Sequence, residues 1–429
     1  MKVAAYPTYD RYRDSGVVWI GKIPSHWTVK RAGFILDELN QRSKDGSEPL
    51  LSLSKVQGVI RRDSMAERGG QAESLVGYRV VSEGDIVVNR MQASNGLIAI
   101  SKISGITSPD YAIYRVKNDA PMHADVVATL LQQVEYQGEI KRRVKGVMEG
   151  FIRLYSEDLF RLPLICAPLP EQCAIAAFLD DKCAKIDEAV RIKEAQIGLL
   201  RERRQILIQQ AVTRGLNPDA PMKDSGIDWI GQIPAHWEVR RGKHLFREVN
   251  ERSEEGTEEL LSVSHMTGVT SRSEKNVYMF MAEDYSGSKL CKPGDIVINT
   301  MWAWMGALGV SDLTGIVSPS YGVYRPLRET SFNRRFLEWL LRTTPFIEQY
   351  NRISTGLHSS RLRLYPHMFL GLPIATPTRE EQDAIVEFVE NEAGKIDSVI
   401  TIKQAQITTL KEYKTCLINA AVTGKIKVT

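Results

Sequence analysis

The stretch SGVVWIGKIPSHW at residues 15–27 returns almost unchanged as SGIDWIGQIPAHW at residues 225–237. Both stretches hold two tryptophans, an Ile-Pro step and a histidine in the same frame. Two explanations compete: a duplicated active site around His26 and His236, or a duplicated fold whose copies both contain this segment. The offset between Trp19 and Trp229 is 210 residues, and its reach along the chain separates the two.

The same offset aligns the rest of the chain without a gap in the matched blocks. GDIVVNRMQASNG at residues 84–96 matches GDIVINTMWAWMG at 294–306, and LLSLSKVQGV at 50–59 matches LLSVSHMTGV at 260–269. Further along, EQCAIAAFLDDKCAKIDEAV at 171–190 matches EQDAIVEFVENEAGKIDSVI at 381–400. Self-similarity at a fixed period is the signature of a repeated structural unit. The sequence therefore predicts two copies of one unit.

Each copy begins with mixed secondary structure and ends in one long helix. Short β-branched runs separated by Gly, Asn and Ser predict strands and turns over most of each copy. We expect one helix inside this part, at residues 124–144 in the first copy and 332–350 in the second. The fold class is therefore α+β (mixed), with two similar α/β domains, two long helices and an internal repeat with an offset of 210.

The two long helices carry a narrow apolar seam. Apolar residues recur in alternating steps of three and four, which is the 3.5-residue period of a coiled coil. Thr378 and Glu381 predict a capping box at the start of the second helix, and Pro170 stands where a first-turn proline is tolerated. The predicted seam consists of Ile186, Val190, Ile197, Leu200, Leu207, Ile396, Ile400, Ile407, Leu410 and Leu417.

A lone helix of about 40 residues, roughly 60 Å long, needs a partner for such a seam. We expect the two helices to pair as an antiparallel coiled coil. Polar residues inside a seam can fix its register, and Lys193, Arg204, Lys403 and Lys414 occupy such slots. The alternative, in which each helix packs on its own domain, stays open. The predicted mixed domains are residues 1–165 and 216–375, and the predicted helices are residues 166–215 and 376–429.

Composition excludes several classes of protein. Of the 429 residues, 43% are hydrophobic and 25% are charged, as in ordinary globular proteins. No run approaches the roughly 20 apolar residues of a membrane span, and the polar N-terminus lacks the apolar stretch of a signal peptide. The five cysteines form no C-x-x-C pair, which favours reduced thiols and a cytoplasmic location. A net charge of +4 neither requires nor excludes nucleic acid.

The sequence contains no recognisable catalytic or cofactor-binding motif. It lacks the G-x-x-x-x-G-K-[ST], G-x-G-x-x-G, H-E-x-x-H and G-x-S-x-G patterns. Asp85 and Asp295 each follow a glycine, in turns that enter predicted strands, and no second acid or base recurs beside His26 and His236. We therefore expect a chain without a catalytic site, a metal or a cofactor of its own, in which both histidines are partly buried and structural.

The two copies differ at the side chains that follow shared strands. Arg90, Gln92 and Asn95 follow GDIVVN, whereas Trp302 and Trp304 follow GDIVIN. Arg, Gln and Asn can make paired hydrogen bonds to a base edge in the major groove, and tryptophans offer stacking or contact with a thymine methyl. Drift between duplicated domains would also produce differences, but the loops as groups favour base readout. The predicted base-reading residues are Lys55, Gln57, Arg61, Arg62, Arg90, Gln92, Asn95, His265, Thr267, Arg272, Trp302 and Trp304.

Basic clusters flank these segments and are suited to phosphate contacts, which position a protein on DNA. Two similar but non-identical readers on a stiff helix pair would suit double-stranded DNA with two different half-sites, about one helical turn of ~34 Å apart. The predicted phosphate-binding residues are Arg142, Arg143, Lys145, Arg352, Arg361 and Arg363.

These motifs, in this order, resemble the specificity subunit of type I restriction-modification systems. The resemblance rests on W-I-G-x-I-P-x-H-W, the G-D-I-V strand, GLHSSRLRLYPHMF at residues 356–369 and the E-Q-x-x-I that leads into each long helix. It covers nearly the whole chain and implies two target-recognition domains, each followed by a conserved helix of an antiparallel coiled coil. VKGVMEGFIRLYS at residues 144–156 lacks the Ser-Ser-Arg of residues 359–361, so the resemblance does not imply a shared phosphate contact there.

The resemblance also implies partners. Such a subunit is not itself catalytic: it binds two modification (methyltransferase) subunits and, in the full enzyme, two ATP-dependent restriction subunits. Those partners would carry S-adenosylmethionine, ATP and Mg²⁺. The leading hypothesis is a DNA-recognition subunit that reads a bipartite, asymmetric target. The alternatives are a duplicated coiled-coil assembly scaffold without DNA readout, and a self-contained methyltransferase that itself binds S-adenosylmethionine.

Overall fold

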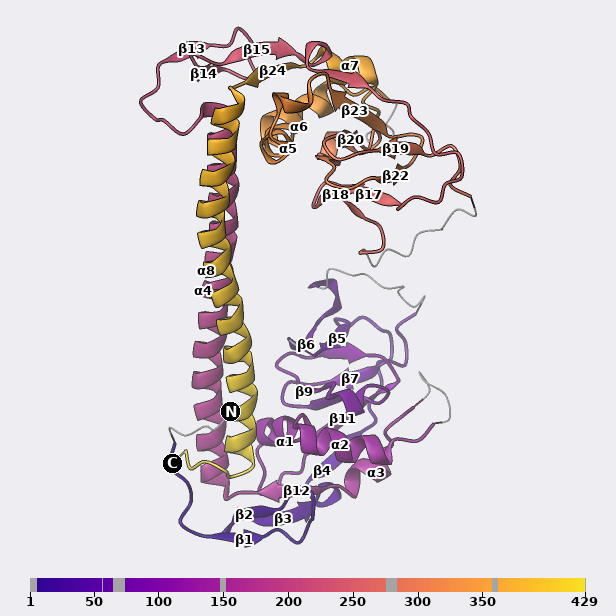
Figure 1. The fold of residues 1–429 in the computed structure, drawn as a ribbon. Helices are drawn as coiled ribbons and strands as arrows, with labels where there is room; N and C mark the ends of the chain where they lie inside the picture. The colour runs from indigo at the N-terminus through magenta and orange to yellow at the C-terminus, as the bar shows by residue number, and fades with distance from the viewer. Residues whose placement is uncertain are drawn as a thin grey trace. The chain divides into compact units, whose positions relative to one another are not determined.

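The computed structural model describes residues 6–55, 57–64, 74–146, 152–274, 284–356 and 362–428. The chain divides into two compact units: unit 1 comprises Met1–Glu194 with Gln404–Thr429, and unit 2 comprises Ala195–Lys403. Both units contain equivalent elements in the same order, as the 210-residue repeat predicts (Figure 1).

Unit 1 is built around a four-stranded antiparallel sheet in the order β4-β11-β8-β9. Strand pairs β1-β2, β3-β12, β5-β6 and β7-β10 surround it. Its strands are β1 (Tyr12–Asp14), β2 (Lys22–Pro24), β3 (Thr28–Arg31), β4 (Leu36–Leu39), β5 (Leu51–Ser54), β6 (Gly58–Arg61), β7 (Arg79–Val81), β8 (Ile86–Asn89), β9 (Ile98–Ile100), β10 (Gly105–Thr107), β11 (Tyr111–Val116) and β12 (Pro163–Cys166). Its short helices are α1 (Ala124–Leu131), α2 (Val134–Arg143) and α3 (Ser156–Phe160).

Unit 2 repeats this plan with the sheet β16-β23-β20-β21 and the pairs β13-β14, β15-β24, β17-β18 and β19-β22. Its strands are β13 (Met222–Asp224), β14 (Gln232–Pro234), β15 (Glu238–Arg241), β16 (Phe246–Glu248), β17 (Leu261–Ser264), β18 (Gly268–Ser271), β19 (Lys289–Cys291), β20 (Ile296–Ile298), β21 (Leu308–Val310), β22 (Gly315–Val317), β23 (Gly322–Pro326) and β24 (Pro373–Thr376). Its short helices are α5 (Arg334–Leu341), α6 (Thr344–Ile353) and α7 (Pro366–Gly371).

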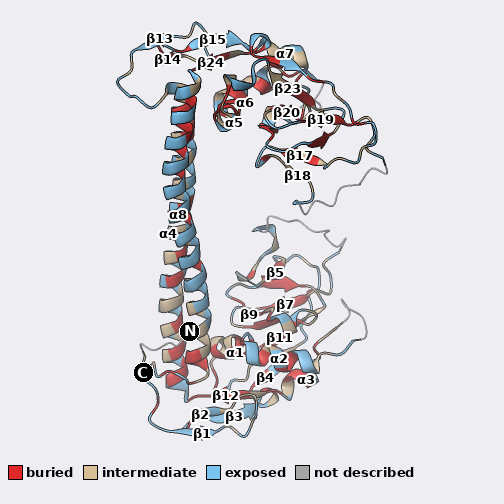
Figure 2. Cartoon of the chain, in the orientation of Figure 1, coloured by how far each residue is buried: buried red, intermediate tan, exposed pale blue. Residues whose placement is uncertain are grey.

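The central strand β8 is buried on both faces, which explains its unbroken apolar run. Successive side chains of a strand point to opposite faces. Ile86 and Val88 accordingly belong to the large core that includes α1, whereas Val87 belongs to a smaller core with Ile113 of β11 and Leu51 of β5. The red, buried segments of Figure 2 follow these strands. Strand β20 repeats the pattern in unit 2.

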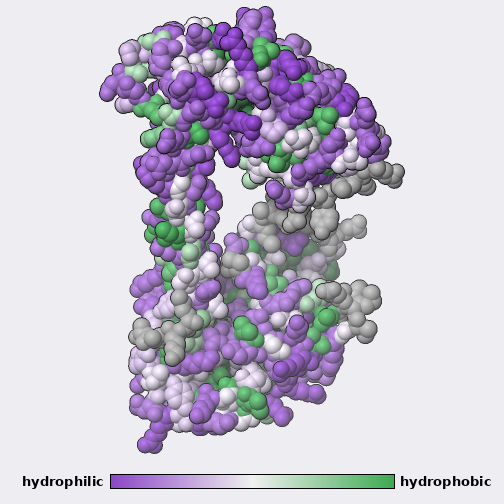
Figure 3. Space-filling view, viewed as in Figure 1, coloured by the Kyte–Doolittle hydropathy of each residue, from purple (hydrophilic) through white to green (hydrophobic). Residues whose placement is uncertain are grey.

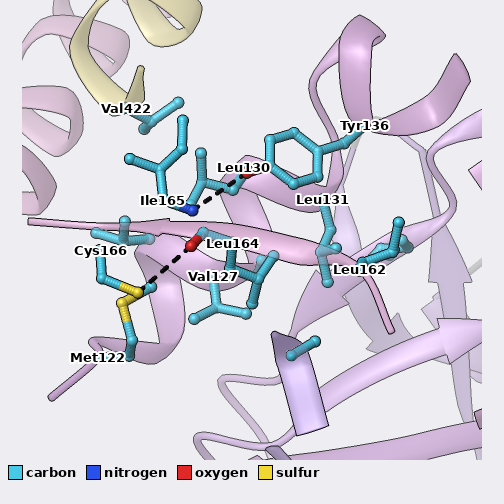
Figure 4. Packing of buried hydrophobic residues seen from close by; sticks show 14 of the residues in the cluster. Met122, Val127, Leu130, Leu131, Tyr136, Leu162, Leu164, Ile165, Cys166 and Val422 are labelled. Atoms are coloured by element: carbon cyan, nitrogen blue, oxygen red, sulfur yellow. Dashed lines mark hydrogen bonds between the residues drawn. The ribbon is translucent and has the colours of Figure 1, made fainter. Parts of the chain in front are cut away.

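The large core of unit 1 joins segments far apart in the sequence. Figure 4 shows Val127 of α1, Tyr136 of α2 and Leu164 of β12 packed together, with Val422 from the end of the last helix beside them. The Tyr136 hydroxyl accepts the Ile165 backbone N–H at 3.3 Å, and burial raises the pKa of this tyrosine. The end of the chain is therefore part of the first unit's core.

The expectation of a single helix at residues 124–144 and 332–350 is wrong, because the structure has two short helices in each range: α1 and α2 in unit 1, and α5 and α6 in unit 2. In unit 2, Thr343 adopts extended angles (φ −66°, ψ 151°) and Pro345 lies in the first turn of α6. A proline inside a continuous helix would lose one hydrogen bond and clash with the preceding turn. Unit 1 breaks at the equivalent Gln133 (φ −70°, ψ 150°) without a proline, and the Gln133 side chain donates to the Thr129 carbonyl at 2.7 Å.

The two long helices are α4 (Leu169–Arg214, 46 residues) and α8 (Arg379–Val422, 44 residues). In unit 1 the first part of α4 packs antiparallel on the last part of α8, with Asp187 bonded to Lys414 at 2.7 Å and Lys193 bonded to Gln406 at 2.7 Å. The helices therefore pair with each other, and the alternative of a helix packed only on its own domain is wrong.

Unit 2 pairs the remaining parts of the same helices in the same sense. Lys403 donates to Gln196 at 2.7 Å, and Arg204 lies 3.2 Å from Asp397. All four basic residues in the seam thus bond across to the other helix. Ion pairs that are specific to one alignment help to fix register, even where their exposure keeps their free energy small.

The predicted seam residues differ in burial. Those with under 10% of their surface exposed are Ile186, Val190, Ile197, Ile400, Ile407 and Leu417, and those partly buried are Leu200, Leu207, Ile396 and Leu410. The predicted capping box is half formed. The Glu381 N–H donates to the Thr378 hydroxyl at 3.3 Å, but the Glu381 carboxylate turns toward the tryptophan segment instead.

Candidate nucleic-acid interface

The duplicated tryptophan segment is joined to the start of each long helix by one glutamate. In unit 1 the Glu171 carboxylate accepts from Trp27 Nε1 at 3.1 Å and lies 2.9 Å from His26 Nε2. The Tyr9 hydroxyl also donates to Glu171, and burial together with this carboxylate raises the pKa of Tyr9. Trp27 is 1% exposed, whereas the His26 side chain is 47% exposed.

Unit 2 repeats the junction at Glu381, which lies 2.8 Å from His236 Nε2 and accepts from Trp237 Nε1 at 3.0 Å. The expectation that no acid recurs beside the histidines is therefore wrong, because a carboxylate 145 residues further along contacts each of them. Each carboxylate binds the tryptophan and the histidine of its unit and so ties the domain to its helix. The arrangement is a structural junction.

The glutamine that follows each of these glutamates reinforces the junction. Gln172 accepts the His123 N–H at 2.8 Å and donates to the Ala167 carbonyl at 2.7 Å. Gln382 makes the equivalent bonds with Asn333 and Pro377. Sequence reasoning missed this role, although the recurring Glu-Gln pair was a visible signal.

The Gly-Asp turns are structural, as the sequence predicted. Gly84 has φ +87°, a conformation that favours glycine. Asp85, which is fully buried, accepts the Ser82 N–H and two bonds from Arg115 at 2.7 and 3.0 Å. Hydrogen bonding to this carboxylate raises the pKa of Arg115. Asp295 and Arg325 repeat the pair in unit 2.

In unit 1 most of the predicted base-reading residues lie on two exposed turns. Lys55 and Gln57 occupy the turn between β5 and β6. Gln92 and Asn95 are exposed around the 3₁₀ helix η3 (Ala93–Asn95) between β8 and β9, and Asn95 Nδ2 donates to Gln92 Oε1 at 2.6 Å. Strand β6 packs against β9, so both turns belong to one region of the domain.

The three arginines of this set have different surroundings. Arg61 is exposed and lies 3.1 Å from Asp63, and Arg62 is half-buried. Arg90 turns inward, with Nη2 2.6 Å from Glu38 Oε1 and its side chain 20% exposed. Its buried Nε has no hydrogen-bond partner among the described residues. The structure thus gives Arg90 an internal partner, and its base-reading role remains a prediction.

In unit 2 the equivalent turns carry different chemistry. Trp302 stacks on Trp304 around the 3₁₀ helix η5 (Ala303–Met305), with ring centroids 6.0 Å apart and planes at 22°. His265 and Thr267 are exposed in the turn between β17 and β18. Arg272 is half-buried, and its Nη2 makes no hydrogen bond with the described residues.

The predicted phosphate-binding residues lie on α2 and α6 or in the segments that follow these helices, and α2 contacts η3 while α6 contacts η5. In unit 1, Arg142 and Arg143 pair with Glu139 at the end of α2, and Lys145 lies 2.7 Å from Asp158. In unit 2, Arg352 and Arg363 are exposed, while Arg361 lies outside the described residues.

In both units a backbone hydrogen bond joins the segment after the second short helix to the start of the loop after the central strand. The Leu154 N–H donates to the Arg90 carbonyl at 2.9 Å, and the Leu364 N–H donates to the Thr300 carbonyl at 3.0 Å. These bonds hold Leu154 and Leu364, the residues after Arg153 and Arg363, at the start of the η3 loop (residues 90–96) and the η5 loop (residues 300–306), although each bonded pair is more than 60 residues apart in the sequence.

Within the ranges that the structure describes, no three His, Cys, Asp or Glu side chains gather as a metal site would require. In the same part of the chain, no helix is both long and apolar enough to cross a membrane.

Comparisons with known proteins point to one group. No family model matches the chain. The chain is 24% identical over 430 residues to the MjaVIII type I restriction enzyme specificity subunit of Methanocaldococcus jannaschii, covering 95% of this chain and 94% of that protein.

Two solved structures share the fold. A chain from a study of complex assembly and conformational transition of the type I R-M system has a TM-score of 0.64 at 15% identity, covering 93% of this chain and 98% of the other. The HsdS subunit from Thermoanaerobacter tengcongensis has a TM-score of 0.51 at 15% identity, covering 94% of this chain and 98% of its own. In sequence over nearly its whole length, and in fold, the chain is similar to the specificity subunits of type I restriction-modification systems.

Proposed function

We propose that this chain is the DNA-recognition subunit of a type I restriction-modification complex and reads a bipartite, asymmetric target, one half with each unit. Full-length similarity to a type I specificity subunit and the shared fold support this function. The mixed domains at residues 1–165 and 216–375 are the two target-recognition domains, and residues 166–215 and 376–429 are the conserved helices.

The observation that carries the proposal is where the two units differ. They share the glutamate junction, the Gly-Asp turn and the buried aspartate–arginine pair. They diverge at exposed positions of equivalent loops: Gln92 and Asn95 in unit 1 correspond to Trp302 and Met305 in unit 2. A common frame with different exposed loops is what two readers of different base sequences require.

Within this proposal, the exposed residues of the predicted sets are the ones that contact DNA. Gln57, Gln92, Asn95, His265 and Trp302 are the foremost base contacts, because their side chains are exposed on the turns. The cations that contact phosphates are Arg142, Lys145, Arg352 and Arg363. Cations beside a base-reading loop fix the position of the protein on the duplex.

The chemistry belongs to the partners in this proposal. Two modification subunits supply S-adenosylmethionine-dependent adenine methylation, and two restriction subunits supply ATP- and Mg²⁺-dependent cleavage, in the cytoplasm. This chain is non-catalytic and positions them on its target. The absence of catalytic motifs from its sequence supports this division of labour.

Selection from a random library of duplex DNA tests the proposal. The full chain is assembled with the modification subunits of the same host, and bound sequences are recovered. We expect two fixed half-sites separated by an unselected spacer. Gln92→Ala with Asn95→Ala should relax one half-site only, and Lys22→Ala, which removes an exposed charge on β2, should leave the motif unchanged.

The scaffold alternative makes the opposite prediction. A coiled-coil scaffold without DNA readout would assemble with its partners and select no sequence. That result would refute the recognition proposal, whereas a selected motif that the η3 substitutions leave unaltered would refute the assignment of Gln92 and Asn95 as base contacts.

A further inference from the structure

The η3 and η5 loops have matching backbone angles, but one carries polar amide side chains and the other carries apolar ones. Gln92 has φ −116° and ψ 12°, and the equivalent Trp302 has φ −121° and ψ 11°. Gly96 and Gly306 close the two loops with φ +77° and +81°. Because the backbones match, any difference in what the loops bind must come from their side chains.

The unit 1 loop offers hydrogen-bonding groups. Gln92 and Asn95 are exposed, and Asn95 Nδ2 donates to Gln92 Oε1, a bond that uses one donor of Asn95 and neither donor of the Gln92 amide. Side-chain amides of this kind recognise the paired donor and acceptor of an adenine edge.

The unit 2 loop offers an apolar surface that is held rigid. Trp304 Nε1 donates to the Met301 carbonyl at 3.0 Å, which fixes this indole, and Trp302 stacks on it. Trp302 is nevertheless 48% exposed and Met305 36% exposed. Met266, at the tip of the β17-β18 turn, is 78% exposed.

Trp302 and Met305 leave apolar side-chain surface exposed around η5. On the face drawn in Figure 3, hydrophobic residues form small green patches within a largely hydrophilic surface. Exposed apolar side chains that cluster on a rigid support indicate a binding surface. The cluster formed by Trp302, Trp304 and Met305 therefore needs an apolar counterpart on its ligand.

On the major-groove edges of DNA, the apolar group is the thymine C5-methyl. Intercalation of the pair is a poor alternative, because adjacent base pairs are about 3.4 Å apart in the stack and the two indole centroids are already 6.0 Å apart. Two stacked indoles are too thick for one step. The pair is better suited to contact base edges from the groove.

The charge beside the loop fits the same ligand. The Leu364 N–H bonds to the Thr300 carbonyl, which holds exposed Arg363 next to the start of the loop. A cation at the margin of an apolar contact surface can take a phosphate of the strand whose bases the loop contacts.

We propose that the Trp302–Trp304–Met305 cluster makes unit 2 a reader of thymine methyl groups, whereas unit 1 reads its half-site by hydrogen bonds. This inference rests on the proposed function and assigns a chemistry to one of its two half-sites. Trp302 is the residue that determines specificity, and Trp304 is a positioning residue that holds it.

Replacement of thymine by deoxyuridine tests the inference, because it removes the methyl and keeps every hydrogen-bonding group. The half-site of unit 1 is the one that relaxes in the Gln92→Ala, Asn95→Ala chain, and the other belongs to unit 2. Duplexes with the selected motif receive deoxyuridine in one half-site at a time. Their affinity for the assembled complex is measured by fluorescence anisotropy.

We expect deoxyuridine in the unit 2 half-site to weaken binding by roughly four-fold for each contacted methyl. Deoxyuridine in the unit 1 half-site should leave affinity unchanged. Trp302→Ala should lower the affinity for thymine-containing DNA and remove the difference between thymine and deoxyuridine. Gln92→Ala should retain that difference.

Three results would overturn the inference while leaving the proposed function intact. They are equal affinity for thymine and deoxyuridine in the wild-type chain, retained discrimination in Trp302→Ala, and a unit 2 half-site without any A·T pair. Failure of the proposed function looks different, since no half-site would then be selected at all.

Discussion

Removal of the junction glutamates should destabilise the two units by different, calculable amounts. Glu171 accepts hydrogen bonds from two buried donors, Trp27 and Tyr9, and from half-exposed His26. Among the described residues, Glu381 has one buried donor, Trp237, besides an exposed histidine. A buried donor that loses its acceptor costs about 1–3 kcal/mol. At roughly 1.5 kcal/mol for each buried donor, Glu171→Ala should cost about 3 kcal/mol and Glu381→Ala about half of that.

Hydrogen exchange followed by mass spectrometry measures both losses of stability, because peptides from the two units are followed separately in each variant. Peptides that cover the β3-β12 pair report on unit 1, and peptides that cover the β15-β24 pair report on unit 2. Exchange in unit 1 of Glu171→Ala should be accelerated about ten-fold more than exchange in unit 2 of Glu381→Ala, because roughly 1.4 kcal/mol corresponds to a factor of ten. In a Tyr9→Phe background the excess should disappear. Equal effects in the two units, or an excess that survives Tyr9→Phe, would refute this reasoning.

Other substitutions test other parts of the account. Burial raises the pKa of Cys291 to about 11 from 9.0, so its contribution to stability is full below pH 9 and is lost as the pH rises toward 11. Cys291→Val should remove this loss, at most about 3 kcal/mol, in urea unfolding series from pH 8 to 11, and an unchanged alkaline loss would contradict it. Leu417→Ala, at a fully buried seam position, should cost about 2–5 kcal/mol, whereas Lys414→Ala should cost less than about 1 kcal/mol, and similar Tm shifts would count against the seam. Arg90→Ala removes a partner of Glu38, so it should lower the Tm of unit 1 and leave the selected motif unchanged. An unchanged Tm with a relaxed half-site would make Arg90 a base reader.

The repeat made much of the fold predictable from the sequence. Two copies with one offset, the long helices and the Gly-Asp turns follow from local patterns such as periodicity and turn residues. The division into units was less accessible. Because α4 and α8 run antiparallel, each unit takes part of both helices, so its residues are not one continuous copy of the repeat.

The site residues show where local patterns fail. The partner of His26 lies 145 residues away, and neither segment alone indicates the other. The pattern places Arg90 in an exposed loop, yet its guanidinium pairs with Glu38 of β4, a strand separated from β8 by β11. The break before Val134 contains no proline, and the bond from the Gln133 side chain to the Thr129 carbonyl is not visible in the sequence. Pairings between distant segments depend on tertiary contacts that periodicity does not encode.

The methylated motif of a host that expresses this chain with its modification subunits tests the central claim most directly. Sequencing that detects N6-methyladenine gives this motif across the genome. We predict a bipartite, asymmetric motif in which Gln92→Ala with Asn95→Ala relaxes one half and Trp302→Ala relaxes the other. A genome without a sequence-specific motif, or a motif that neither change alters, would contradict the account.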